Sequence, residues 1–169
     1  EPKQWGGVGI LAMKRMIPKL TDQEHDPTNL GRWASIQVQG KASHRVRIVS
    51  AYIPCVAAES ETSSGGKVWD QHQRYFNAQD RFDVNPREAF IEDFEKQAKD
   101  WQTAGDFIIV CLDANEDVRE GPVSSMFYRL GLQEAILTRH HQYSPPATYN
   151  RNTKRRPIDG IFISPELQV

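Results

Sequence analysis

An aspartate and an asparagine stand where an apolar segment ends, and both side chains could bind a cation or a phosphate group. The apolar run 108–112 leads directly into Asp113, and Asn115 follows two positions later. A carboxylate beside a buried strand is costly unless a cation or a hydrogen-bond donor meets it. Residues two apart on an extended chain point the same way, so Asp113 and Asn115 could converge on one ligand. The alternative is that Asp113 begins a turn and caps the next element.

Two further residues could join this chemistry. Asp159 stands at the start of the apolar run that ends near residue 163, although aspartate is disfavoured in strands. Tyr52 ends another apolar segment, and its hydroxyl could donate to a phosphate oxygen. The alternatives are a solvent-facing strand edge for Asp159 and ordinary packing for Tyr52.

A short basic run is the best candidate for contact with a polyanion. The formal net charge is −1, so nucleic acid is not attracted to the chain as a whole and any polyanion site must be a local patch. Such runs contact phosphates without reading sequence. A solvated hairpin loop is the alternative for the run, which consists of Arg151, Lys154, Arg155 and Arg156.

Hydrophobic patterns predict the elements that would position these residues. Alternating or continuous apolar stretches predict five strands, and the polar residues 59–67 predict an exposed loop. A turn over 40–43 would join the second strand to the third. The predicted strands are 8–13, 33–39, 45–53, 107–112 and 158–164.

Two helices are expected between the later strands. Asn85, Pro86 and Glu88 form a helix start with a cap, a proline in the first turn and a glutamate three residues after the cap. That helix would end near residue 104, and a second would span 123–130. Strands mixed with helices in this way indicate an α/β layered domain.

Length and composition indicate one globular domain. The 169 residues contain no apolar run near the ~20 needed to cross a bilayer, and the first residues do not resemble a signal peptide. Cys55 and Cys111 stand in apolar segments, which predicts buried free thiols and an intracellular, reducing compartment, the nucleus included. Solvated positions are expected for Asp70, His72, Asp80 and Asp83.

Five motifs occur in an order that carries a resemblance. They are Gly6-Gly7-Val8-Gly9-Ile10, Tyr52-Ile53-Pro54, Leu112-Asp113-Ala114-Asn115, Thr148-Tyr149 and Pro157-Ile158-Asp159-Gly160. In this order they resemble the endonuclease/exonuclease/phosphatase superfamily of deoxyribonuclease-like, metal-dependent phosphoesterases, over nearly the whole chain. The resemblance implies an α/β fold, a four-layer sandwich of two mixed β-sheets flanked by helices.

The chain also departs from the family pattern. Leu112 and Ala114 replace a glycine and a phenylalanine of the family's Gly-Asp-Phe-Asn motif, and Pro157 replaces an arginine. The family's opening strands, with an asparagine and the glutamate that is its principal metal ligand, have no counterpart in 1–169, and neither does its closing Ser-Asp-His. We therefore expect residues 1–169 to be a partial domain, truncated at both ends.

The resemblance assigns roles to four residues and implies Mg²⁺ as cofactor. Asp113 would orient or deprotonate the attacking water, and Asn115 would hold the phosphate or the metal, so these two are the expected metal residues. Tyr52 would contact a phosphate oxygen, and Asp159 would orient the family's histidine.

The implied function is a metal-dependent phosphoesterase, first of all a nuclease that hydrolyses phosphodiester bonds in nucleic acid, such as the endonuclease of a mobile element. A phosphatase acting on a small phosphate ester or a phosphoinositide is the first alternative. The second is a non-catalytic remnant, because the glutamate and the histidine are absent from the sequence. The pattern leaves the oligomeric state open.

Overall fold

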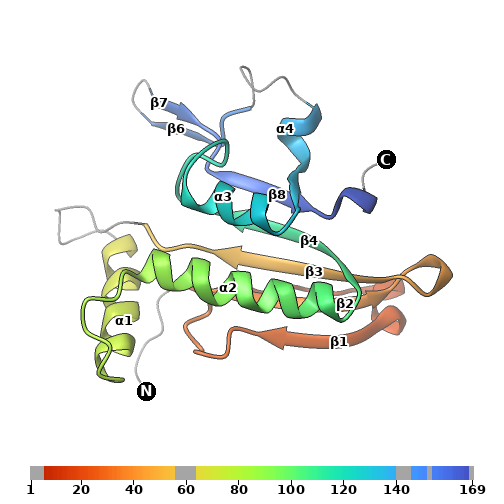
Figure 1. The fold of residues 1–169 in the computed structure, drawn as a ribbon, viewed down its shortest axis with the longest axis horizontal. Helices are drawn as coiled ribbons and strands as arrows, with labels where there is room; N and C mark the ends of the chain where they lie inside the picture. The colour runs from red at the N-terminus through yellow and green to blue at the C-terminus, as the bar shows by residue number, and fades with distance from the viewer. Residues whose placement is uncertain (1–5, 56–63, 140–145, 152–153, 168–169) are drawn as a thin grey trace.

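A mixed six-stranded sheet forms the centre of the computed structural model, which describes residues 6–55, 64–139, 146–151 and 154–167 (Figure 1). The strands lie in the order β1-β2-β3-β4-β8-β5, and a separate two-stranded sheet pairs β6 with β7. Neighbours in the large sheet are antiparallel except β3 and β4, which are parallel. The strands are β1 (Leu20–His25), β2 (Trp33–Gln39), β3 (Arg45–Tyr52), β4 (Asp106–Asp113), β5 (Gln133–Glu134), β6 (Tyr149–Arg151), β7 (Lys154–Arg156) and β8 (Asp159–Ile163).

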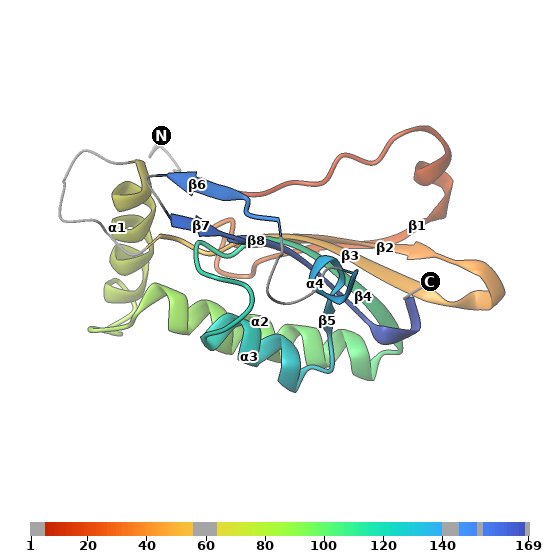
Figure 2. The same cartoon turned by 90° about the horizontal axis from the view of Figure 1, so that it is seen from above.

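The two helices that connect the central strands lie on one face of the sheet. Figure 2 shows α2 and α3 on that side, whereas the chain from the N-terminal region to the first 3-10 turn passes over the other side. The predicted α/β class, with two sheets and flanking helices, is confirmed. The helices are α1 (Ser64–Asn77), α2 (Pro86–Thr103), α3 (Pro122–Arg129) and α4 (Ala135–Arg139), with 3-10 turns η1 (Lys14–Lys19), η2 (Lys41–Ser43) and η3 (Pro165–Leu167).

The start of α2 follows from its sequence, and its inner face fills the core. The Asn85 side chain accepts the Arg87 backbone N–H at 2.9 Å, which satisfies one of the free donors at a helix start. Phe90 and Phe94 are fully buried and each lies nearly perpendicular to the Trp33 ring, at centroid distances of 5.8 and 5.5 Å. Each such burial contributes about 2–3 kcal/mol, so α2 is fixed on the sheet largely by its aromatic side chains.

Helix α3 is fixed to the last strand by an aromatic stack. The rings of Phe127 and Phe162 are nearly parallel, with centroids 3.8 Å apart, and both side chains are buried. Gly160 lies under this contact, because an added Cβ would come within 2.9 Å of Phe162 and 3.3 Å of Val118. A larger residue at this position would therefore crowd the Phe162 ring that stacks on Phe127 and the side chain of Val118.

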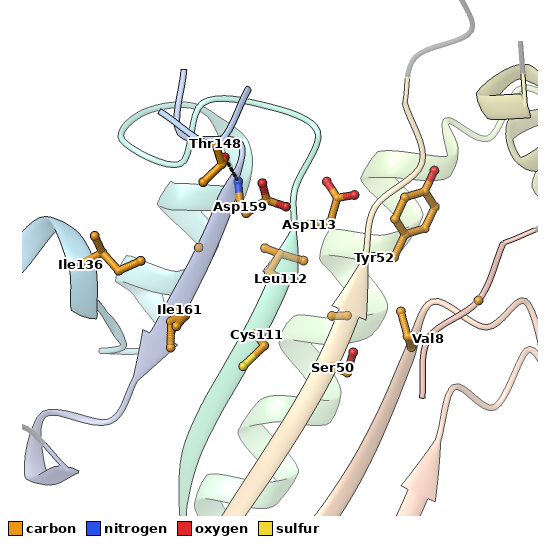
Figure 3. A pocket seen from close by; sticks show the side chains of 13 residues that line it. Val8, Ser50, Tyr52, Cys111, Leu112, Asp113, Ile136, Thr148, Asp159 and Ile161 are labelled. Atoms are coloured by element: carbon orange, nitrogen blue, oxygen red, sulfur yellow. Dashed lines mark hydrogen bonds between the residues drawn. The ribbon is translucent and has the colours of Figure 1, made fainter. Parts of the chain in front are cut away.

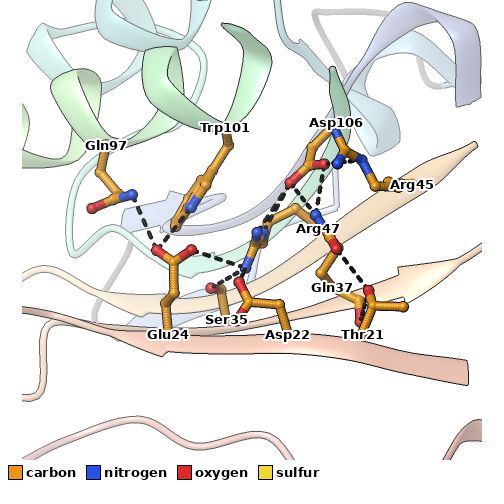
Figure 4. Close-up of polar contacts among 10 residues, drawn as sticks. All are labelled: Thr21, Asp22, Glu24, Ser35, Gln37, Arg45, Arg47, Gln97, Trp101 and Asp106. Atoms are coloured by element: carbon orange, nitrogen blue, oxygen red, sulfur yellow. Dashed lines mark hydrogen bonds and ion pairs between the residues drawn. The ribbon is translucent and has the colours of Figure 1, made fainter. Parts of the chain in front are cut away.

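A buried polar cluster closes the end of the sheet where β4 begins (Figure 4). Asp106 has a fully buried side chain and receives hydrogen bonds from Arg47 Nε at 3.2 Å and Gln37 Nε2 at 2.8 Å. Arg47 also pairs with Asp22 at 2.9 Å, and Glu24 accepts the Trp101 indole N–H at 3.1 Å. The cluster fastens the edge strand β1 to β3 and α2 through hydrogen bonds that satisfy the buried charges.

Four sequence predictions need correction. The segment 8–13 is not a strand, because it pairs with no strand of the described sheets, and its side chains Leu11 and Met13 are 84% and 58% exposed. The first strand begins only at Leu20. The predicted loop 59–67 is helical from Ser64, and its residues 59–63 lie outside the described ranges.

The remaining two corrections concern burial. The thiols expected to be buried are not: Cys111 is exposed and Cys55 half-buried. His72, expected in solvent, is 1% exposed on α1, whose Phe76 packs in a buried cluster with Leu30 and Ala89. Within the described ranges, the helices are too short or too polar to cross a bilayer.

Candidate active site

Three of the four predicted site residues form a row across neighbouring strands at one end of the sheet. Tyr52 ends β3 and is the register partner of Asp113, which ends the parallel strand β4. Asp113 is in turn the register partner of Asp159, which begins the antiparallel strand β8. Figure 3 shows the two carboxylates side by side, with the Tyr52 ring directed toward the same edge. Segments far apart in sequence thus place a phenol and two carboxylates at adjacent positions.

The two carboxylates lie close enough to influence each other. Burial raises the pKa of Asp113, and the negative charge of Asp159 raises it further. The Asn115 backbone N–H and the positive charge of Arg87 act in the opposite direction. The net shift of the pKa is upward, so Asp113 is protonated more easily than an aspartate in water.

The loop after β4 is shaped by the predicted asparagine. Asn115 adopts a positive φ of 50°, a conformation that asparagine tolerates better than most residues. Its backbone N–H donates to Asp113 Oδ1 at 3.2 Å, and its side-chain Nδ2 donates to the Ile53 carbonyl at 2.9 Å. Asn115 therefore orients Asp113 and ties the end of β4 to the end of β3.

Thr148 fixes the start of β8. Its Oγ1 accepts the backbone N–H groups of Ile158 at 2.9 Å and Asp159 at 3.1 Å. The short β6–β7 sheet follows directly, and its Arg155 and Arg156 are exposed. A basic hairpin is thus anchored beside the carboxylate row. The side chains of Arg151 and Lys154 lie outside the part of the structure that can be described.

An open groove of about 530 Å³ runs from the carboxylates over the face of the sheet that α2 and α3 leave uncovered. Its upper end is polar, and its lower part is lined by apolar side chains and the exposed Cys111 thiol (Figure 3). Burial and the nearby Asp113 raise the pKa of Tyr52, so its phenol is a donor at neutral pH. The apolar lining includes Val8, Leu112, Ile136 and Ile161.

The outcome for the predicted site residues is therefore mixed. Tyr52, Asp113 and Asp159 line one groove, whereas Asn115 lies on the loop beside it with its amide nitrogen turned to Ile53. Their catalytic roles stay predictions. The sequence did not indicate a role for Arg87, which donates hydrogen bonds to the segments after β3 and β4, because its position two residues after Asn85 indicated only a helix start.

The carboxylates of this site suit a hydrated Mg²⁺ ion that is bound by only a few protein side chains. Among the residues that the structure describes, no group of three or more His, Cys, Asp or Glu side chains could hold a metal. The Asp113–Asp159 pair nevertheless supplies two adjacent carboxylates. Mg²⁺ prefers oxygen ligands, keeps several waters and needs only one or two carboxylates.

Comparison with known proteins supports the fold. No protein-family model matches the sequence, and no curated protein matches it. The 3′ phosphatase NExo from Neisseria, in a structure bound to a product DNA hairpin, superposes with a TM-score of 0.55 at 14% identity. The 3′-5′ exonuclease NExo from Neisseria meningitidis gives 0.54 at 16% identity. In both, 87% of this chain covers 59% of the other.

The human Nocturnin catalytic domain with a bound sulfate anion gives a TM-score of 0.50 at 20% identity, with 87% of this chain covering 48% of that one. These proteins belong to the endonuclease/exonuclease/phosphatase superfamily. The resemblance read from the motifs is thereby confirmed as a likeness of fold, over a chain that spans about half to three-fifths of the length of the structures it matches.

Proposed function

We propose that the row formed by Tyr52, Asp113 and Asp159 belongs to a metal-dependent phosphoesterase site that hydrolyses phosphodiester bonds in nucleic acid. The observation that carries the proposal is the register pairing of Asp113 with Asp159, which places two carboxylates at one strand end on a phosphoesterase fold. Open α/β sheets keep their sites at such strand ends. The solved structures of this fold include a phosphatase bound to DNA, which supports a phosphate ester as substrate.

Each residue of the row would have a role that its chemistry allows. Asp113 and Asp159 would hold Mg²⁺, which when bound would neutralise phosphate charge and stabilise the leaving oxygen. Asp113 would also orient the attacking water or accept its proton. The Tyr52 phenol would donate to a phosphate oxygen. Asn115 would keep the Asp113 carboxylate in position through its backbone N–H. A role for its side-chain oxygen in phosphate or metal binding is what the resemblance implies.

The basic hairpin favours nucleic acid over a small phosphate ester. Arg155 and Arg156 are exposed on β7, and Thr148 anchors the hairpin to the backbone of Asp159. Cations beside a phosphodiester site increase affinity for a polyanion in a salt-dependent way. A phosphatase on a small ester would gain little from this arrangement.

A cleavage assay tests the proposal. The chain is incubated with labelled single-stranded DNA, duplex DNA, RNA and bis-p-nitrophenyl phosphate, each with Mg²⁺ or with EDTA. We expect Mg²⁺-dependent cleavage of a nucleic acid, lowered at least 100-fold by Asp113→Asn and by Asp159→Asn and unchanged by Asp70→Asn, an exposed control on α1.

Three results would argue for another function. Hydrolysis of the small ester alone would favour the phosphatase. The absence of Mg²⁺-dependent hydrolysis on every substrate would favour the non-catalytic remnant. Cleavage that survives Asp113→Asn would show that the site lies elsewhere.

A further inference from the structure

Arg87 bridges the two chain segments that carry the carboxylate row. It stands in the first turn of α2 and is 9% exposed. Its Nη1 donates to the Pro54 carbonyl and its Nη2 to the Ala114 carbonyl, each at 2.9 Å. Pro54 lies two residues after Tyr52, and Ala114 directly follows Asp113. One guanidinium therefore joins the chain immediately beyond both site residues.

Glu116 completes this bridge. Its Oε2 accepts a hydrogen bond from Arg87 Nη2, and its Oε1 accepts the Val123 backbone N–H at 3.0 Å at the start of α3. The loop that contains Asn115 is thus held between the first turns of α2 and α3. A shift of either helix would be transmitted to this loop.

Only a guanidinium suits this position. Two backbone carbonyls and one carboxylate converge on a single buried side chain, and arginine presents its donors in a rigid planar fork. A lysine ammonium is a compact point charge that cannot span the two carbonyls in the same geometry. An apolar side chain would leave these acceptors buried without donors, at the cost of their desolvation.

We propose that Arg87 is a positioning residue of the site, which sets the spacing between Tyr52 and the Asp113–Asn115 loop. It does not line the groove, and its hydrogen bonds described above go to the protein's own carbonyls and to Glu116. It acts on the site through the segments that it joins, in addition to the direct effect of its positive charge on Asp113, which the lysine variant keeps. This inference rests on the proposed function for its catalytic consequence, while its structural consequence is independent of any activity.

The test compares Arg87→Lys and Arg87→Met with Arg129→Met. The control also removes a link between α2 and α3, the Arg129–Glu95 ion pair, but on the exposed side. The backbone amide and side-chain NH₂ signals of Asn115 are recorded by ¹H–¹⁵N NMR. Mg²⁺-dependent cleavage is measured at a temperature where every variant is fully folded.

We expect both Arg87 variants to displace the Asn115 signals and to lower kcat at least tenfold, with KM within about threefold of wild type. Arg129→Met should leave the Asn115 signals and kcat unchanged. If Arg87→Met does not fold, the milder Arg87→Lys decides the question.

The inference is overturned if folded Arg87→Lys keeps the wild-type Asn115 signals and kcat. If the wild-type chain hydrolyses nothing, the proposed function fails, and the Asn115 signals still decide the role of Arg87. Unchanged signals then overturn the inference, and displaced signals support it.

Discussion

Asp113 and Asp159 are register partners on adjacent antiparallel strands, so their two carboxylates lie directly across from each other at the end of the sheet. Like charges at such positions are destabilising by about 0.2–1 kcal/mol. The two adjacent carboxylates should therefore favour cation binding but lower the stability of the chain when no cation is bound.

Replacing one of the two carboxylates should stabilise the chain when divalent cations are absent. In EDTA we expect Asp113→Asn to raise the free energy of unfolding by about 0.5–1 kcal/mol, because it removes the repulsion and keeps Oδ1 as acceptor for the Asn115 N–H. In Mg²⁺ the wild type should gain stability and the variant should not. Urea unfolding with and without Mg²⁺ measures both effects, and a variant less stable than wild type in EDTA would contradict the prediction.

Gly160→Ala should destabilise the chain by about 1–3 kcal/mol, because its Cβ would come within 2.9 Å of the Phe162 ring and crowd the stack of that ring on Phe127. Gly9→Ala is a matched control, since a Cβ there meets nothing within 4 Å. Thermal unfolding compares the two variants. Equal melting temperatures would mean that the Phe162 ring moves aside without cost.

Asp106→Ala should cost about 3–5 kcal/mol of unfolding free energy, because it leaves the buried Arg47 guanidinium and the Gln37 amide without their shared acceptor. Arg45→Ala removes a pair to the same carboxylate from a side chain that is 40% exposed, so we expect less than about 1 kcal/mol. Chemical denaturation of both variants measures the two losses of unfolding free energy. Losses of similar size would mean that Arg47 finds another partner when Asp106 is removed.

His72 should make the chain sensitive to mild acid. Burial, and after it the positive charge of Arg32, lower the pKa of His72 to about 4 in the folded state, against about 6.5 when unfolded. Between these values the unfolded state binds the extra proton, so stability should fall as the pH drops from 6.5 to 4, by up to about 3 kcal/mol.

The matched variants for this prediction are His72→Phe and His25→Phe. Urea unfolding at several pH values should show the acid-dependent loss reduced in His72→Phe and kept in His25→Phe, whose histidine is exposed. A loss of equal size in both variants would assign the acid sensitivity to other groups.

Local signals in the sequence were sufficient for the elements nearest the site. Asn85 and Pro86 mark the start of α2, and the apolar run before Asp113 marks β4, because capping and burial depend on neighbouring residues. The order of the motifs was enough to place Tyr52, Asp113 and Asp159 at one edge of the sheet.

Local sequence patterns did not predict the features that depend on residues far away in the chain. The buried face of β2 carries Ser35 and Gln37, whose polar side chains would suggest solvent. They are buried because Arg47 and Asp106, up to 69 positions away, complete their hydrogen bonds. The apolar segment 8–13 also shows the importance of distant partners. Its local pattern fits a strand, but no strand pairs with it in the described sheet, so it does not form one.

The parallel pairing of β3 with β4 also has a kinetic consequence. It joins chain segments separated by α1 and α2, and the Asn115–Ile53 hydrogen bond at its end spans 62 positions. Closing so long a loop costs chain entropy before any contact compensates for it, so such pairings form slowly. The carboxylate row should therefore assemble only in the late, rate-limiting step of folding, and partly folded chains would expose the hairpin of β2 and β3 long before they could bind a cation.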